Sequence, residues 1–249
     1  MLNAILWGMF AVIFAGGEGQ RLHPLTQRVP KPMVKVDGKP ILEGNIEWVK
    51  RAGVTDIILC TGYKKEVIEE YFGTGARHGV ALTYLDDKIP GAGSYAAARD
   101  ALAIIPPSEQ DAIIMAGDVM TNTDPAQLVR AHREGRNELT IYSIFHVVPL
   151  GVIDVNEKGF VTDLRAKPEL RANSAIGVTS THIFDRLQEG TGDFFDQSIL
   201  QLKGLVRAYR DRESRWWHIT DVYDLARVNK EFRQARISRE GQQGQRERF

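Results

Sequence analysis

A loop of closely spaced glycines is the first feature of this sequence that could take part in chemistry. Residues 15–22 read Ala-Gly-Gly-Glu-Gly-Gln-Arg-Leu and end an apolar run. Gly16, Gly17 and Gly19 would let the backbone approach a ligand closely and point its N–H groups at phosphate oxygens. The loop therefore predicts an anion-binding site at the end of a buried strand.

Two cations follow the glycines. Arg21 can hold phosphate oxygens with its planar guanidinium group, and Lys31 supplies a compact positive charge. Pro30 and Pro32 flank Lys31 and restrict the backbone that presents it. Glycines followed by prolines could also form a solvated turn and a connector without any function. The prediction of a phosphate site therefore depends on the glycines, Arg21 and Lys31 occurring together at this spacing.

Two common nucleotide-binding motifs do not fit this loop. A Rossmann dinucleotide fingerprint requires a third glycine where this chain has Leu22. A P-loop requires a Gly-Lys-Ser/Thr sequence after the glycines, and none follows here. The loop therefore belongs to another class of phosphate site.

The composition excludes several functions. Lys+Arg and Asp+Glu both number 32, and a formal net charge of zero argues against a general nucleic-acid-binding surface. The single cysteine, Cys60, excludes an internal disulfide and a cysteine-cluster zinc site, and it favours a reducing, cytoplasmic location. The six histidines show no metal-ligand spacing.

The apolar start of the chain does not predict secretion or a membrane span. No Lys or Arg precedes the run 1–15 and no small-residue cleavage site ends it. It is also shorter than the roughly 20 residues that cross a bilayer. We interpret 11–15 as a buried strand and 1–8 as an extension, with Met9 as an alternative start of the protein.

Strands and helices alternate up to about residue 150, which predicts an α/β fold with a Rossmann-like, mixed but mostly parallel sheet flanked by helices. Asp124, Pro125 and Gln127 predict a helix start with a capping box. The predicted strands are 11–15, 56–61, 81–85 and 112–115, and the predicted helices are 42–53, 67–73 and 94–104.

The pattern changes in the second half of the chain. Strands are predicted at 139–148 and 152–155, and turn residues 156–159 lead into a hairpin partner at 160–165. A last amphipathic helix is predicted at 222–232. We expect one domain over 1–235, with halves 9–138 and 139–235, and a disordered polar tail at 236–249.

The glycine loop resembles the signature of the sugar nucleotidyltransferases, which reads Gly-Gly-x-Gly-x-Arg-Leu-x-Pro-Leu-Thr and continues with Pro-Lys-Pro-Met. Weaker matches extend over residues 11–232, among them Pro-Ile-Leu at 40–42, Ala-Gly-Val at 52–54, Thr-Gly-Tyr at 61–63 and Gly-Asp at 117–118. The resemblance implies transfer of a nucleotidyl group from a nucleoside triphosphate to a sugar 1-phosphate, with release of pyrophosphate. It also implies that the first half binds the nucleotide and that the β-rich second half binds the sugar.

The resemblance also implies roles for single residues. Arg21 and the loop would hold the triphosphate, Lys31 would neutralise charge near the α-phosphate, and Asp118 would bind Mg²⁺. Without the resemblance, Asp118 could equally be a helix cap or a turn residue. The implied nucleotide-binding residues are Ala15, Gly16, Gly17, Gly19 and, in a loop that is one residue shorter here, Gly91.

The sugar side departs from the family pattern. Lys167 matches the lysine of a Glu-Lys-Pro string that contacts the sugar phosphate, but Ala166 replaces the glutamate. Gly151 matches a glycine ahead of this hairpin. Lys167 and Gly151 are therefore the implied sugar-phosphate residues, and the identity of the sugar is in doubt.

The expected second metal ligand is displaced by one position. Family members place an aspartate where this chain has Thr220, and Asp221 follows. One position reverses the face of an extended chain. Asp221 could reach the metal through irregular backbone, or it could cap the last helix; both remain open.

Two other functions stay open. The acceptor could be another phosphomonoester such as phosphocholine, or the chain could be a non-catalytic regulatory subunit that binds a nucleotide sugar. We expect no nucleic-acid or membrane partner. A homo-oligomer is open, and the sequence does not reveal the nucleobase.

Overall fold

Seven strands form the central sheet of the computed structural model, which describes residues 9–86 and 93–246, with side chains up to residue 235. Their order is β12-β8-β11-β6-β1-β4-β5. Only β11 runs against the others, which confirms a mixed, mostly parallel sheet. The strands are β1 (Phe10–Phe14), β4 (Asp56–Thr61), β5 (Ala81–Asp86), β6 (Asp111–Ala116), β8 (Leu139–Val147), β11 (Glu169–Ser180) and β12 (Val206–Tyr209).

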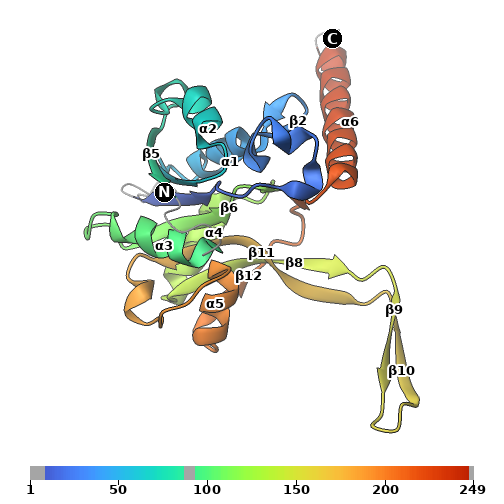
Figure 1. Ribbon diagram of the computed structural model, residues 1–249. Coiled ribbons are helices and arrows are strands. Elements are labelled where there is room, and N and C mark those ends of the chain that lie inside the picture. Colours follow the sequence, from blue (N-terminus) through green and yellow to red (C-terminus); the bar gives the residue numbers. More distant parts are fainter. Residues whose placement is uncertain (1–8, 87–92, 247–249) are drawn as a thin grey trace.

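Helices cover both faces of this sheet (Figure 1). In β1, Ala11 and Ile13 belong to the core layer under α1, α2 and α4, whereas Val12 belongs to the layer under α3 and α5. Strands buried on both faces read as continuous apolar runs, and β1 does so. The helices are α1 (Ile41–Lys50), α2 (Lys65–Phe72), α3 (Gly93–Ala103), α4 (Pro125–Gly135), α5 (Phe194–Gln201) and α6 (Val222–Arg246).

The four strands predicted for the first half correspond to β1, β4, β5 and β6, each within one residue at either end. Asp124 caps α4, because its Oδ1 accepts a hydrogen bond from the N–H of Ala126 at 3.0 Å, and Pro125 is the first helical residue. The predicted capping-box contact is not formed by Gln127, whose Oε1 accepts a hydrogen bond from the hydroxyl of Tyr209 at 3.1 Å.

The two predicted halves share one sheet. β8, β11 and β12 all come from the second half, and β11 pairs with β6 of the first half. This pairing places residues of both halves on the same core layers.

The last helix differs from the prediction. α6 continues past residue 232 to Arg246, through much of the segment expected to be disordered. The Gln, Arg and Glu residues of this segment have favourable helix propensity, and a helix that has already started can be extended by them. No helix in the described parts of the chain is long and apolar enough to cross a membrane.

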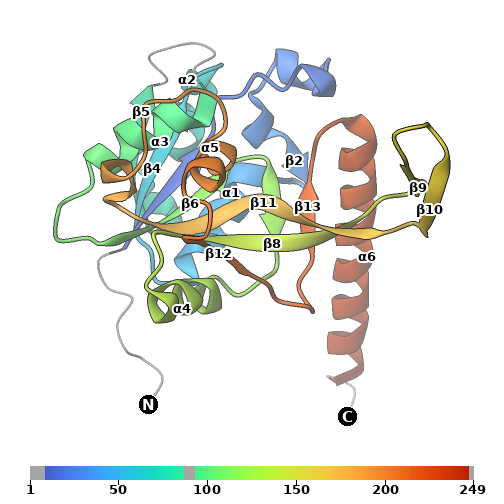
Figure 2. The ribbon, with the colours of Figure 1, turned by 90° about the horizontal axis from the view of Figure 1, so that it is seen from below.

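Four short strands pair outside the central sheet: β2 (Lys35–Val36) with β3 (Lys39–Pro40), and β7 (Val119–Thr121) with β13 (Trp216–His218). The predicted hairpin is formed by β9 (Gly151–Val155) and β10 (Val161–Ala166). It projects far from the rest of the molecule, as Figure 1 shows, and we call residues 150–167 the arm. Figure 2 shows the arm from a second side, beyond α6.

Candidate functional site

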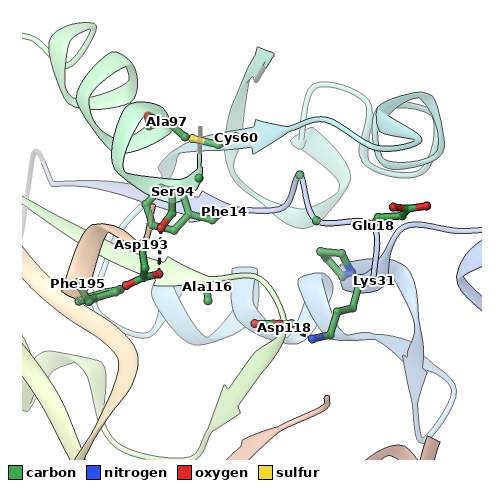
Figure 3. A pocket seen from close by; sticks show the side chains of 14 residues that line it. Phe14, Glu18, Lys31, Cys60, Ser94, Ala97, Ala116, Asp118, Asp193 and Phe195 are labelled. Carbon is green, nitrogen blue, oxygen red and sulfur yellow. Dashed lines mark hydrogen bonds and ion pairs between the residues drawn. The ribbon is translucent and has the colours of Figure 1, made fainter. Parts of the chain in front are cut away.

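A cavity of about 450 Å³ opens at the carboxyl ends of three parallel strands. Phe14 at the end of β1, Cys60 in β4 and Ala116 at the end of β6 all line it (Figure 3). The chain leaves β1 toward β4 and β5 and later returns to β6 on the other side of β1. Ligands of open α/β sheets bind at such a switch of direction.

The glycine loop forms one wall of this cavity. Gly16 and Gly17 line it, and a Cβ atom added to Gly17 would meet nothing within 4 Å, so this backbone is open to a ligand. Ala15 contributes differently from the expectation that it binds nucleotide. Its N–H donates to the carbonyl of Cys60 at 2.7 Å, and therefore it continues the sheet instead of pointing at a ligand.

Gly19 positions the lysine. Its φ is +68°, a left-handed conformation that strains other residues. A Cβ atom added there would lie 2.8 Å from Cβ of Lys31, closer than side chains tolerate. The carbonyl of Gly19 also accepts a hydrogen bond from the hydroxyl of Thr26 at 2.9 Å. Glycine is thus required here for Lys31 to pass close to the loop.

Lys31 and Asp118 form an ion pair inside the cavity. Nζ of Lys31 lies 2.6 Å from Oδ2 of Asp118, and the two side chains are only 10% and 24% exposed (Figure 3). The sequence prediction that these two residues meet at one site agrees with this geometry. Each of the two nearly buried groups thus has a partner of opposite charge.

His218 is a second partner of the Asp118 carboxylate. Nε2 of His218 lies 3.3 Å from Oδ2 of Asp118, because β13 pairs with β7 immediately after Asp118. Burial by itself raises the pKa of Asp118, but hydrogen bonding from His218 and the charge of Lys31 outweigh it and lower the pKa to about 2. Asp118 is therefore ionised at neutral pH.

The opposite wall comes from the starts of two helices, which the sequence analysis did not assign to the site. The hydroxyl of Ser94 in α3 donates to Oδ2 of Asp193 at 3.0 Å and accepts from the N–H of Phe194 at 2.8 Å. Figure 3 shows Asp193 and Phe195 across the cavity from the glycine loop. Helix starts present N–H groups and favour anions.

Three further predicted residues do not line the cavity. Arg21 is exposed and does not line it. Gly151 and Lys167 lie on the arm, where Lys167 is exposed and has a left-handed backbone with φ +46°. Gly91 lies outside the described residues.

Asp221 caps a helix. Its Oδ1 accepts hydrogen bonds from the N–H groups of Tyr223 at 2.8 Å and Asp224 at 2.9 Å, at the start of α6. Trp217 and Ile219 are buried in a core cluster, and His218 between them lies on the other side of the chain, where its Nε2 faces Asp118. Of the two readings left open for Asp221, this geometry favours the cap.

Removing the charge of Asp118 tests the interpretation of its lowered pKa. An ionised carboxylate stabilises the fold above its unfolded pKa, near 3.8, and this contribution is lost as the pH falls toward about 2. We expect the wild type, compared with Asp118→Asn, to lose about 2 kcal/mol of unfolding free energy between about pH 5 and pH 2. Urea titrations in the presence of EDTA measure this difference, and a constant difference over that range would contradict the assignment.

The cap assigned to Asp221 predicts different effects of two substitutions. Asp221→Ala removes the acceptor at the helix start and should lower the unfolding free energy by about 1 kcal/mol. Asp221→Asn keeps an acceptor and should stay close to the wild type. Equal stability of the alanine variant and the wild type in thermal denaturation would show that the cap contributes nothing.

Comparisons with known proteins agree with this geometry. The sequence model of the nucleotidyl transferase family matches residues 10–189. The mannose-1-phosphate guanylyltransferase of Mycobacterium tuberculosis is 30% identical over 83% of this chain, which spans 59% of that enzyme. The D-glycero-alpha-D-manno-heptose 1-phosphate guanylyltransferase of Aneurinibacillus thermoaerophilus is 29% identical, over 86% of this chain and 91% of its own length.

A solved structure shows the same fold. HddC from Yersinia pseudotuberculosis has a TM-score of 0.71 at 22% identity, with 90% of this chain and 99% of that chain covered. The family match covers most of the chain, including the glycine loop, Lys31 and Asp118. The chain belongs to the nucleotidyl transferase family.

Proposed function

We propose that the protein transfers a nucleotidyl group from a nucleoside triphosphate to a sugar 1-phosphate, giving a nucleoside diphosphate sugar and pyrophosphate. The observation that carries this proposal is the nearly buried Lys31–Asp118 pair beside the open backbone of Gly16 and Gly17. A fixed cation, open amides and an ionised carboxylate in one cavity suit a triphosphate better than an uncharged ligand. Relatives that act on sugar 1-phosphates support the acceptor class.

In the proposed reaction, an oxygen of the sugar phosphate attacks the α-phosphorus of the triphosphate. A new P–O bond forms there, and the bond between the α-phosphorus and the bridging oxygen breaks, so that pyrophosphate leaves with the electron pair. No proton has to be transferred, and the protein acts by positioning and by charge neutralisation. Lys31 would lie against the α-phosphate, and the amides around Gly17 would hold the phosphates of the leaving group.

We further propose that Asp118 holds Mg²⁺ in this reaction. Its carboxylate is ionised, and only Oδ2 is engaged by Lys31 and His218. Among the described residues no group of three or more His, Cys, Asp or Glu side chains could hold a metal. One protein carboxylate together with substrate phosphates and water is a common environment for Mg²⁺, so the donor set fits. When bound, the ion would neutralise charge on the phosphates.

The residues proposed to bind the sugar phosphate, Lys167 and Gly151, lie on the arm and do not line the cavity. For Lys167 and Gly151 to contact the sugar phosphate, the base of the arm has to approach the cavity when substrate is bound, and Arg21 likewise has to turn toward the triphosphate. Ala166 replaces the glutamate whose carboxylate family members use, so an acceptor other than a hexose phosphate, such as phosphocholine, is the second candidate.

We place the reaction in the cytoplasm, where nucleoside triphosphates are available and Cys60 stays reduced.

A substrate panel tests the proposed reaction. Pyrophosphate release should be measured with Mg²⁺ for GTP, UTP, CTP and dTTP, each with mannose, glucose and heptose 1-phosphates and with phosphocholine. We expect release with one pair of substrates to exceed the others by more than about tenfold. Release only with phosphocholine would select the second candidate. Nucleotide-sugar binding without any release would instead identify a regulatory subunit.

The role of Lys31 can be separated from a general loss of positive charge. Lys31→Ala should lower turnover by about a hundredfold or more, because the cation next to the reacting phosphate is lost. Lys35→Ala is the matched control, since Lys35 is close in sequence but exposed, and its turnover should be unchanged. Circular dichroism melts establish that both variants fold. Turnover of Lys31→Ala close to the wild type would remove this residue from the mechanism.

A further inference from the structure

The arm has one apolar face and one polar face. In the register of its two strands, Ile153 lies opposite Leu164 and Val155 lies opposite Val161, so these four side chains share one face. The pairs between them in the ladder, such as Asp154 with Asp163, lie on the other face. The hairpin is therefore as amphipathic as a strand pair that covers a hydrophobic core.

A β-bulge in β10 keeps the apolar and the polar side chains on separate faces of the hairpin. The register shifts between Val161 and Asp163, which leaves Thr162 as an extra residue in β10. In a regular strand, Val161 and Asp163 would share a face because they are two positions apart, but the register shift at Thr162 turns them to opposite faces. The bulge thus places Val161 on the same face as Leu164, and the sequence maintains a continuous apolar surface along the arm.

This apolar face is exposed along its whole length. The four aliphatic side chains are between 53% and 62% exposed, and Phe160 at the tip is 67% exposed. Together they present on the order of 500 Å² of apolar surface, near the upper end of what monomers expose, about 300–600 Å². β9 and β10 pair only with each other in the described part of the chain. Isolated two-stranded hairpins are marginally stable in water, so the arm lacks a covering layer.

We propose that a second copy of this chain covers the arm, with the two apolar faces packed against each other around a two-fold axis. The face is complementary to itself, because its side chains are all aliphatic and it carries no charge that would repel an identical surface. Charges on the other face are balanced within the arm, where Arg165 forms an ion pair with Asp154 at 3.0 Å. The chain as a whole has no net charge, so long-range repulsion does not oppose association.

The area available is compatible with a stable dimer. A specific interface buries about 800 Å² of each partner, and the apolar face of the arm supplies more than half of this amount. Leu150 and Leu170, which are 70% and 48% exposed at the base of the arm, extend the same region toward the central sheet. The arm projects away from the body in Figure 1, so its apolar face is accessible to a second chain.

Sedimentation equilibrium of the full chain, from about 1 to about 100 µM, tests the proposal. We expect the wild type to be dimeric at the upper end of this range. The double variant Ile153→Asp/Leu164→Asp places charges in the interface, and its dissociation constant should rise by at least about a hundredfold.

A matched control carries the same substitutions elsewhere. Ile104 and Leu200 are 50% and 59% exposed and lie after α3 and in α5, away from the arm. The variant Ile104→Asp/Leu200→Asp should remain as dimeric as the wild type. Circular dichroism shows whether each variant is folded.

Hydrogen exchange of the unmodified wild type gives a second measurement that does not depend on the variants. Amides of residues 151–166 should exchange more slowly at high protein concentration than at low concentration. A wild type that is monomeric throughout, even if it binds lipid vesicles or another protein, overturns the proposal. A dimer that survives the substitutions in the arm, or that is lost equally in the control, overturns it as well.

Discussion

Lys31 and Asp118 are separated by 87 positions in the sequence, and their side chains meet at 2.6 Å with little exposure to water. A buried ammonium group is costly unless a carboxylate faces it, so the position of Lys31 depends on Asp118. Their meeting depends on β1 lying beside β6, since each residue follows one of these strands. It also depends on Gly19, whose left-handed backbone leaves room for the lysine.

The same strand pair explains why the cavity has walls from both halves of the chain. β11 of the second half joins the sheet at the free edge of β6, and the segment after it returns over α3. Asp193 and Phe195 thereby reach the side opposite the glycine loop. One antiparallel strand is enough to attach the second half. The arm continues from β8 and leads back into β11, and it projects outward from the sheet (Figure 1).

The sequence predicted those parts that are determined locally. Apolar runs predicted β1, β4, β5 and β6 within one residue. Of these, β1, β4 and β6 are buried on both faces, so no polar residues interrupt their apolar runs. Lys31 and Asp118 could be paired through their motifs. His218, Ser94 and Asp193 could not be assigned, because their contacts depend on long-range packing between segments about 100 residues apart. The length of α6 was also missed, since polarity alone does not distinguish an exposed helix from a disordered tail.

Thr220 stands where family members have an aspartate, and Asp221 follows it. This difference affects which residues could hold the proposed Mg²⁺. Asp221 is used as a helix cap, because its Oδ1 accepts hydrogen bonds from the N–H groups of Tyr223 and Asp224. A hydroxyl group is a weaker ligand for Mg²⁺ than a carboxylate. In the proposed reaction, Asp118 is then the main protein ligand, and phosphate oxygens of the substrate have to supply much of the remaining coordination. Metal binding would be coupled to nucleotide binding, because neither could complete the site alone.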